Sequence, residues 1–267
     1  MRRLFPPPSD PVPPARSEPA ATDPGGQWSL DALADLYAYP PEVAGDGWWL
    51  RGNMVASLDG AAFFDGRSQP LSCPADMRIF GVLRALADAV VVGAQTVRQE
   101  GYTPARARAA FAARRAAAGQ APAPAIAVVT ASLDLDLDSP LFTEPVVPTL
   151  VVTGAAAPPD RVRAVRAAGA EVVYAGEGAG VDPARVPRVL AERGLRRLLT
   201  EGGPKLLGAF LAADVLDELC LTVSPRAVAG TAARVSDGPW LSAPAEFALE
   251  SLLEDAGFLF TRYRRSR

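Results

Sequence analysis

Apolar and polar residues follow two different periods between residues 28 and 267. Short apolar runs bounded by glycine, proline or polar residues predict strands at 48–58, 89–92, 125–130, 149–153, 171–174, 195–200 and 218–223. Apolar residues three and four positions apart predict helices at 28–39, 74–87, 160–168, 183–193 and 203–212, and helical propensity adds a candidate at 105–118. Two further apolar segments, 247–253 and 258–263, predict a terminal hairpin.

The order of these elements predicts the fold class. Strands that alternate with helices form mostly parallel sheets covered on both faces, so we expect an α/β fold. Residues 1–27 are rich in Pro, Ala, Gly and Ser and show no period, which predicts a flexible Pro-rich N-terminal arm. No linker-like composition interrupts residues 28–267, and we expect a single domain there.

Charge and hydropathy narrow the classes of partner. The chain has 27 basic and 30 acidic residues, and its net charge of −3 provides no attraction to nucleic acid or to an anionic membrane. No apolar run reaches the roughly 18 residues that a membrane helix needs, and the first residues lack the apolar stretch of a signal peptide. We therefore expect no nucleic acid, no membrane and a cytoplasmic location.

Histidine is absent, and this absence narrows the chemistry. It excludes Ser-His-Asp and Cys-His nucleophile systems and every metal site that contains histidine. Two cysteines, Cys73 and Cys220, cannot make a four-thiolate zinc site, so we expect no metal. Carboxylates, hydroxyls, Arg and Lys, or a bound organic cofactor must then carry the chemistry.

Three glycine turns mark the carboxyl ends of predicted strands, where parallel sheets bind ligands. Gly202 and Gly203 open a helix and let backbone N–H groups approach a phosphate, although a tight turn without a ligand would use the same residues. Gly93, close to Thr96, lacks the G-x-G-x-x-G spacing, so a packing turn explains it as well. Asp59 before Gly60 ends the first strand, but Asp-Gly is also a hairpin signal.

Taken together, these segments resemble the pyrimidine reductase family of riboflavin biosynthesis. The resemblance rests on MVASLDG at 54–60, LRA at 83–85, DAVVVG at 88–93, TV at 96–97, TEGGPKLL at 200–207 and LDEL at 216–219. It spans about residues 48–264 and is similar to the reductase half of the bifunctional deaminase-reductase. The zinc signature of the deaminase half requires histidine, so the chain resembles a stand-alone reductase.

The resemblance implies a fold, a cofactor and a reaction. The fold is a dihydrofolate-reductase-like three-layer α/β/α arrangement with a mostly parallel central sheet and a C-terminal antiparallel hairpin. The reaction is NADPH-dependent hydride transfer to 5-amino-6-(5-phosphoribosylamino)uracil, in a homodimer. The residues assigned to the cofactor are Ala56, Gly93, Thr96, Thr130, Gly202, Gly203, Pro204, Lys205, Leu206 and Leu207. For the substrate, the resemblance assigns Ser68 and Arg84, with Glu201 at the substrate end. Glu100 and Tyr102 are further substrate candidates from residues 98–104, and Asp59 and Glu201 are the candidate catalytic carboxylates.

Arg84 and Tyr102 can also be interpreted from their own chemistry, without the resemblance. A guanidinium binds phosphate bidentately, so Arg84 is a candidate phosphate fork, with a helix-surface arginine as the alternative. Tyr102 offers a ring that stacks on a flat heterocycle, although an aromatic on a loop also packs locally.

One segment departs from the family pattern and leaves the substrate open. Riboflavin enzymes have Asp-Asp-Pro and then a substrate-binding arginine, whereas residues 98–104 read RQEGYTP. This version resembles stand-alone members, some of which resemble dihydrofolate or other pteridine reductases. With a ribosyl substrate, a carboxylate would orient a hydroxyl or relay a proton to nitrogen. With a pterin it would bind the 2-amino and N3 edge of the ring. A nucleotide-binding module without turnover is the second alternative.

Overall fold

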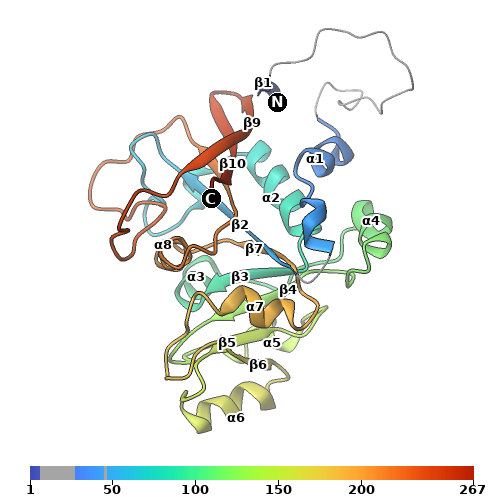
Figure 1. The fold of residues 1–267 in the computed structure, drawn as a ribbon, viewed down its shortest axis with the longest axis vertical. Coiled ribbons are helices and arrows are strands. Elements are labelled where there is room, and N and C mark those ends of the chain that lie inside the picture. The colour runs from blue at the N-terminus through green and yellow to red at the C-terminus, as the bar shows by residue number, and fades with distance from the viewer. Residues whose placement is uncertain (7–27, 45–46) are drawn as a thin grey trace.

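The sheet of the described residues (1–6, 28–44 and 47–267 of this computed structural model) has ten strands (Figure 1). They are β1 (Arg2–Phe5), β2 (Trp49–Ala56), β3 (Ala89–Gly93), β4 (Ala125–Val129), β5 (Leu150–Thr153), β6 (Glu171–Tyr174), β7 (Arg197–Thr200), β8 (Glu218–Val223), β9 (Phe247–Asp255) and β10 (Phe258–Arg265). Their order is β1-β9-β10-β8-β2-β7-β3-β4-β5-β6. All neighbours from β8 to β6 are parallel, whereas β10, β9 and β1 pair antiparallel. The predicted α/β class, with a mostly parallel sheet and a C-terminal hairpin, is confirmed.

Helices cover both faces of the sheet. They are α1 (Leu30–Leu36), α2 (Pro74–Leu86), α3 (Ala94–Glu100), α4 (Ala112–Ala117), α5 (Pro140–Thr143), α6 (Pro159–Ala167), α7 (Val186–Ala191) and α8 (Pro204–Ala212), with 3₁₀ turns at Pro41–Ala44, Gln69–Leu71 and Ala109–Phe111. Val90 and Val92 of β3 pack with residues of α1, α2 and α6, while Ala89 and Val91 pack with α7 and α8. Successive strand residues thus bury against opposite layers, which gives the expected three-layer arrangement. None of the helices in the described ranges is both long and apolar enough to cross a membrane.

Two helices are absent from the sequence prediction, and several are shorter than predicted, as α1, α4 and α7 show. Gly93 ends β3 and is also the N-cap of the seven-residue α3, so the expected glycine turn leads directly into a helix. A helix of this length is too short to show a clear apolar period. Pro140–Thr143 forms the equally unpredicted α5, and within the candidate at 105–118 only residues 112–117 are α-helical.

The start of the chain differs from the expected flexible arm. Residues Arg2–Phe5 form β1, which pairs with β9, and the N-terminal ammonium lies 3.3 Å from the Asp255 carboxylate. A four-residue strand has too few positions to show a period, and its pairing supplies the order that the sequence does not signal. Residues 7–27, which make up most of the predicted arm, lie outside the described part of the chain.

A buried ion cluster joins the antiparallel strands to the parallel block. Glu218 of β8 and Arg51 of β2 are both fully buried, with 2.7 Å between Arg51 Nε and Glu218 Oε1. Arg262 of β10 donates to the same oxygen at 2.8 Å, and the Trp49 indole donates to Oε2 at 3.1 Å. Burial alone would raise the pKa of Glu218, but the two arginines outweigh it and lower that pKa. Glu218 is therefore a permanent anion between three strands.

Glu218→Gln leaves two cations without their counter-charge and is expected to lower the free energy of unfolding by about 3–5 kcal/mol. Urea denaturation of both proteins measures this loss. The matched control is Glu171→Gln, because Glu171 is half exposed and pairs with Arg193 at the surface. Its expected cost is below about 1 kcal/mol. Equal losses in the two variants would contradict a structural role for the buried cluster.

Candidate active site

Two neighbouring cavities lie where strand ends of the parallel block meet α2, α3 and α8. The first has a volume of about 420 Å³ and is lined mainly from β2, α2, α3 and the 62–72 loop. The second, of about 440 Å³, lies between α3, the end of β4 and the start of α8. The residues that line both are Phe63, Thr96, Gln99, Gly203 and Pro204. The two cavities therefore share a wall.

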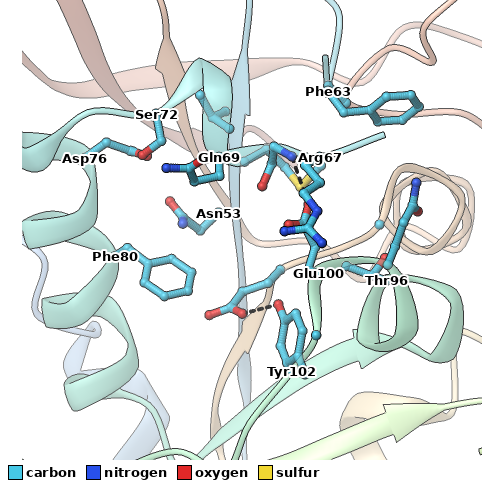
Figure 2. A pocket seen from close by; sticks show the side chains of 18 of the residues that line it. Asn53, Phe63, Arg67, Gln69, Ser72, Asp76, Phe80, Thr96, Glu100 and Tyr102 are labelled. Atoms are coloured by element: carbon cyan, nitrogen blue, oxygen red, sulfur yellow. Dashed lines mark hydrogen bonds between the residues drawn. The ribbon is translucent and has the colours of Figure 1, made fainter. Parts of the chain in front are cut away.

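Glu201 is the central anion of the first cavity. It follows β7 directly and is 7% exposed. Arg84 of α2 donates from Nε to Oε1 at 2.6 Å and from Nη2 to Oε2 at 2.7 Å. The Tyr102 hydroxyl also donates to Oε2, as the dashed line from Tyr102 in Figure 2 shows. One carboxylate thus holds together β7, α2 and the loop after α3.

Burial and neighbouring charges determine the protonation of this cluster. Burial alone would lower the pKa of the Arg84 guanidinium, but Glu201 outweighs it and raises that pKa above its ordinary value. Burial, reinforced by the Glu201 carboxylate, raises the pKa of Tyr102 well above its ordinary value. Arg84 also lies 4.4 Å from the Phe80 ring centroid and 5.3 Å from that of Tyr102. At neutral pH Arg84 is therefore a cation and Tyr102 a protonated phenol.

The phosphate fork expected at Arg84 is occupied within the protein. Arg84 lines the first cavity, but its Nε and Nη2 are both engaged by Glu201. A guanidinium needs such a pair of N–H groups to bind phosphate bidentately. Arg84 therefore holds Glu201 in place rather than presenting this fork to a ligand.

The other expected substrate residues line the same cavity. Ser68, Glu100 and Tyr102 come from the 62–72 loop, the end of α3 and the segment after it. The Ser68 backbone N–H donates to Glu100 Oε1 at 2.9 Å. This bond joins the loop to α3, so the loop closes one side of the cavity.

Most residues expected to bind the cofactor line the second cavity. Gly93, Thr96, Thr130, Gly203, Pro204, Lys205 and Leu206 do so. The nine-residue helix α8 begins there, so its positive end and Lys205 lie at the cavity wall. A Cβ on Gly203 would lie 2.6 Å from Thr96 Oγ1, so the close approach of these segments requires glycine. A helix start, a lysine and hydroxyls suit the diphosphate and sugars of a dinucleotide.

Three expected cofactor residues line neither cavity. Ala56, 4% exposed, ends β2, and its carbonyl accepts a 2.7 Å hydrogen bond from Ser224. Gly202 has a positive φ of 77°, and its carbonyl accepts from the Gly93 N–H at 2.8 Å. Leu207 is fully buried in the core under α8. The structure therefore does not support direct cofactor contacts of their side chains.

Asp59 is placed away from Glu201. It lines neither cavity, and its carboxylate accepts hydrogen bonds from the Val228 N–H at 3.1 Å and the Ala229 N–H at 2.6 Å. Hydrogen bonds from the Ser57 hydroxyl, and then from these backbone groups, lower the pKa of Asp59 to about 2. Asp59 holds two loops together, and the geometry gives no support to a catalytic role.

Several polar residues of the first cavity were not predicted by the sequence analysis, among them Asn53, Arg67 and Asp76. Asn53 interrupts an apolar strand, and Arg67 sits in a loop without a motif. Asp76 lies in the first turn of α2, where an acidic residue is ordinarily explained by the helix dipole. In the part of the chain that the structure describes, no three Cys, Asp or Glu side chains group as metal ligands do.

The RibD C-terminal domain is the family whose sequence model matches residues 48–256, most of the chain. The chain belongs to this family. Every residue that lines the two cavities lies within the matched range. The site is therefore part of the RibD C-terminal domain itself, and the resemblance seen in the motifs is confirmed.

Three known proteins are similar to this RibD C-terminal domain in sequence or in fold. The chain is 32% identical over 179 residues to the 2,5-diamino-6-ribosylamino-4(3H)-pyrimidinone 5′-phosphate reductase of Archaeoglobus fulgidus, covering 67% of this chain and 80% of that protein. A pyrimidine reductase-like protein from Corynebacterium diphtheriae has 26% identity and a TM-score of 0.75, covering 88% of this chain and 98% of that one. The Saccharomyces cerevisiae riboflavin biosynthesis reductase Rib7 shares the fold at 15% identity, with a TM-score of 0.62 over 89% and 99% of the two chains.

The Arg84–Glu201 pair of this RibD C-terminal domain is expected to show strong coupling. Glu201→Gln and Arg84→Met should each lower the free energy of unfolding by about 2–4 kcal/mol, because each leaves a largely buried charge alone. The double variant should lose roughly 1–3 kcal/mol less than the sum. Urea denaturation of the four proteins measures this. The exposed Arg188–Glu192 pair is the control, with an expected coupling below about 0.5 kcal/mol. Additive losses at Arg84 and Glu201 would show that the pair does not hold the site.

Proposed function

We propose that this chain is an NADPH-dependent reductase of riboflavin biosynthesis that transfers hydride to the C1′ centre of a phosphoribosylaminopyrimidine. The substrate expected from the sequence is 5-amino-6-(5-phosphoribosylamino)uracil. Family membership and the name of the Archaeoglobus relative support the pyrimidine class. The observation that carries the proposal is the shared wall at Thr96, Gly203 and Pro204, because a cofactor in one cavity and a pyrimidine in the other would meet there.

The residues of the second cavity fit the cofactor. NADPH, when bound, supplies the hydride. Lys205 and the start of α8 would bind its diphosphate, and the Thr130 hydroxyl would bind a neighbouring sugar or phosphate oxygen. Phe63 and Pro204 add apolar surface to the shared wall and reduce the access of water to it.

The Glu201 cluster would orient the substrate sugar. Hydride adds to the C1′=N bond of the opened sugar, and a proton must reach the nitrogen to complete the secondary amine. Glu201, held by Arg84 and Tyr102, would accept a hydrogen bond from a sugar hydroxyl or relay that proton. Asp59 receives no role, because it lies outside both cavities.

Arg67 is the remaining cation of the first cavity, and we assign the substrate phosphate to it. Among the described residues no carboxylate forms an ion pair with Arg67, in contrast to Arg84. Arg67→Gln should raise KM for a phosphorylated substrate about tenfold, with a smaller change in kcat. Steady-state kinetics with phosphorylated and dephosphorylated substrate measure this. Arg106→Gln, which changes an exposed arginine outside both cavities, is the control. An equal effect on both substrates would contradict the phosphate role.

A dihydrofolate or other pteridine reductase is the second candidate. The observation in its favour is the charge of the first cavity, where Asp76, Glu100 and Glu201 face Arg67 and an Arg84 that is already paired. Such a cavity attracts a phosphate ester only weakly. It accepts a ring with N–H donors more readily.

NADPH oxidation, measured side by side with the phosphoribosylaminopyrimidine and with dihydrofolate, separates these functions. We expect turnover on the pyrimidine. Turnover on dihydrofolate alone would replace the proposal with the second candidate. NADPH binding without turnover of either substrate would indicate a nucleotide-binding module. Failure to bind NADPH would exclude the reductase hypothesis.

A further inference from the structure

Two loops border the site, and together they line both cavities. The first loop, residues 57–67, follows β2, and its Phe63, labelled in Figure 2, lines the first cavity and the second. The second loop, residues 224–238, follows β8 and is called the strap below. Its Ala233 and Asp237 line the second cavity. The 57–67 loop and the strap are therefore adjacent parts of one wall.

Backbone hydrogen bonds join the two loops on either side of Asp59. The Leu58 N–H donates to the Arg226 carbonyl oxygen at 2.7 Å. The Ala62 N–H donates to the Ala233 carbonyl oxygen at 2.9 Å. This pairing is much shorter than a strand ladder, so a side chain that adds hydrogen bonds between the loops has a large share in their order.

The Asp59 carboxylate spans the stretch between these two backbone bonds. It accepts hydrogen bonds from the Val228 N–H at 3.1 Å and the Ala229 N–H at 2.6 Å, and the Ser57 hydroxyl also donates to it. Val228 and Ala229 belong to the strap and line neither cavity. Ala229 has a φ of 57°, a conformation that residues other than glycine rarely adopt and that persists where surrounding contacts hold it. Asp59 supplies such a contact.

A carboxylate suits this position better than an amide. Hydrogen bonds from the Ser57 hydroxyl, and then from the two backbone N–H groups, lower the pKa of Asp59 to about 2, so the group is an anion at neutral pH. An ionised acceptor makes stronger hydrogen bonds than a neutral one. An asparagine would replace one acceptor oxygen by an NH₂ group, which would face N–H donors. The strap thus explains an acid at residue 59 without any contact between Asp59 and a ligand.

The strap is anchored beside both cavities. The Arg226 guanidinium donates to the carbonyl oxygens of Pro70 at 2.9 Å and Ser72 at 3.3 Å, in the segment that leads into α2. At the other end, the Asp237 N–H donates to the Pro204 carbonyl oxygen at 3.1 Å, at the start of α8. The strap therefore runs from the wall of the first cavity to that of the second, and the Asp59 contact lies between its anchors.

We propose that Asp59 is a positioning residue that makes the 57–67 loop and the strap one unit, so that cofactor and substrate each bind more tightly when the other is present. The inference rests on the proposed function, which assigns the cofactor to the second cavity and the substrate to the first. The ligand that binds first orders both loops, and the second then meets a wall that is already ordered. Such coupling is reciprocal.

The coupling is measured with a pair of ligands that does not react. NADP⁺ has no hydride to transfer, so calorimetry gives its dissociation constant alone and with saturating phosphoribosylaminopyrimidine, or with dihydrofolate if that is the substrate. For the wild type we expect NADP⁺ to bind about tenfold more tightly when the substrate is present. In Asp59→Asn this factor should fall to about threefold or less, because the loops no longer act as one unit.

Asp65→Asn is the matched control. Asp65 is an exposed acid of the same loop, lines neither cavity and has a φ of 49°, which asparagine also adopts. The substitution removes the same charge from the same loop without touching the contact with the strap. Asp65→Asn should therefore keep the coupling of the wild type.

Hydrogen–deuterium exchange tests the physical cause of the coupling. Without ligand, peptides from 57–67 and 224–238 should exchange faster in Asp59→Asn than in the wild type, whereas peptides from β3 and β4 should be unchanged. In steady-state kinetics at saturating NADPH, KM for the substrate should rise about threefold or more, and kcat should change less. This split distinguishes a positioning residue from a general loss of the fold.

The outcomes separate this inference from the proposed function. No coupling in the wild type, or equal coupling in the wild type and Asp59→Asn, would overturn the role of Asp59 while the reductase stands. Unchanged exchange in both loops would do the same, as would faster exchange throughout the parallel strands, because Asp59 would then act on the whole domain. Failure of the wild type to bind NADP⁺ would instead overturn the proposed function.

Discussion

The parallel pairing of β7 between β2 and β3 is the constraint on which the site depends. Thr200, the last residue of β7, pairs with Gly52 in the middle of β2 and with Val91 near the end of β3, so Glu201 emerges between these two strands. Glu201 therefore lies within reach of α2, which follows β2, and of the segment after α3, which follows β3. The Arg84 and Tyr102 contacts that result join α2, β7 and the segment after α3 at the first cavity, beside the start of α8. The sheet order brings both halves of the site together.

Sequence reasoning predicted the elements of the parallel block well because they bury on both faces. The strand at 89–92 is four consecutive apolar residues, and nothing but a covered strand accommodates them at this length. The glycine pair after β7 was also a local signal in the sequence. At Gly203 the signal is physical, because a Cβ there would collide with the Thr96 side chain. Short elements such as α3 and β1 were not predicted, because an apolar period requires more residues than they have.

The sequence did not predict which side chains would contact one another in the fold. Arg84 and Glu201 are 117 positions apart, so a cation that looked free in the sequence is paired in the fold. In the sequence Asp76 is an ordinary first-turn acid. Only the structure shows that it accepts a hydrogen bond from Thr222 of a distant strand and lines the first cavity. Asp59 is the opposite case. Its position before a glycine turn predicted a catalytic role, but its carboxylate accepts hydrogen bonds from the backbone of another loop. The homodimer and the cytoplasmic location stay predictions.

The first cavity combines an internally neutralised ion pair with an acid that has no cation. Arg84 and Glu201 satisfy each other, whereas the Asp76 carboxylate accepts hydrogen bonds from hydroxyl groups. In the proposed function, cofactor and substrate would meet at the wall that the two cavities share. A crystal structure with NADP⁺ tests this most directly. We expect the nicotinamide at the shared wall, beside Thr96 and Gly203, and the diphosphate at the start of α8. A nicotinamide bound away from that wall would contradict the account.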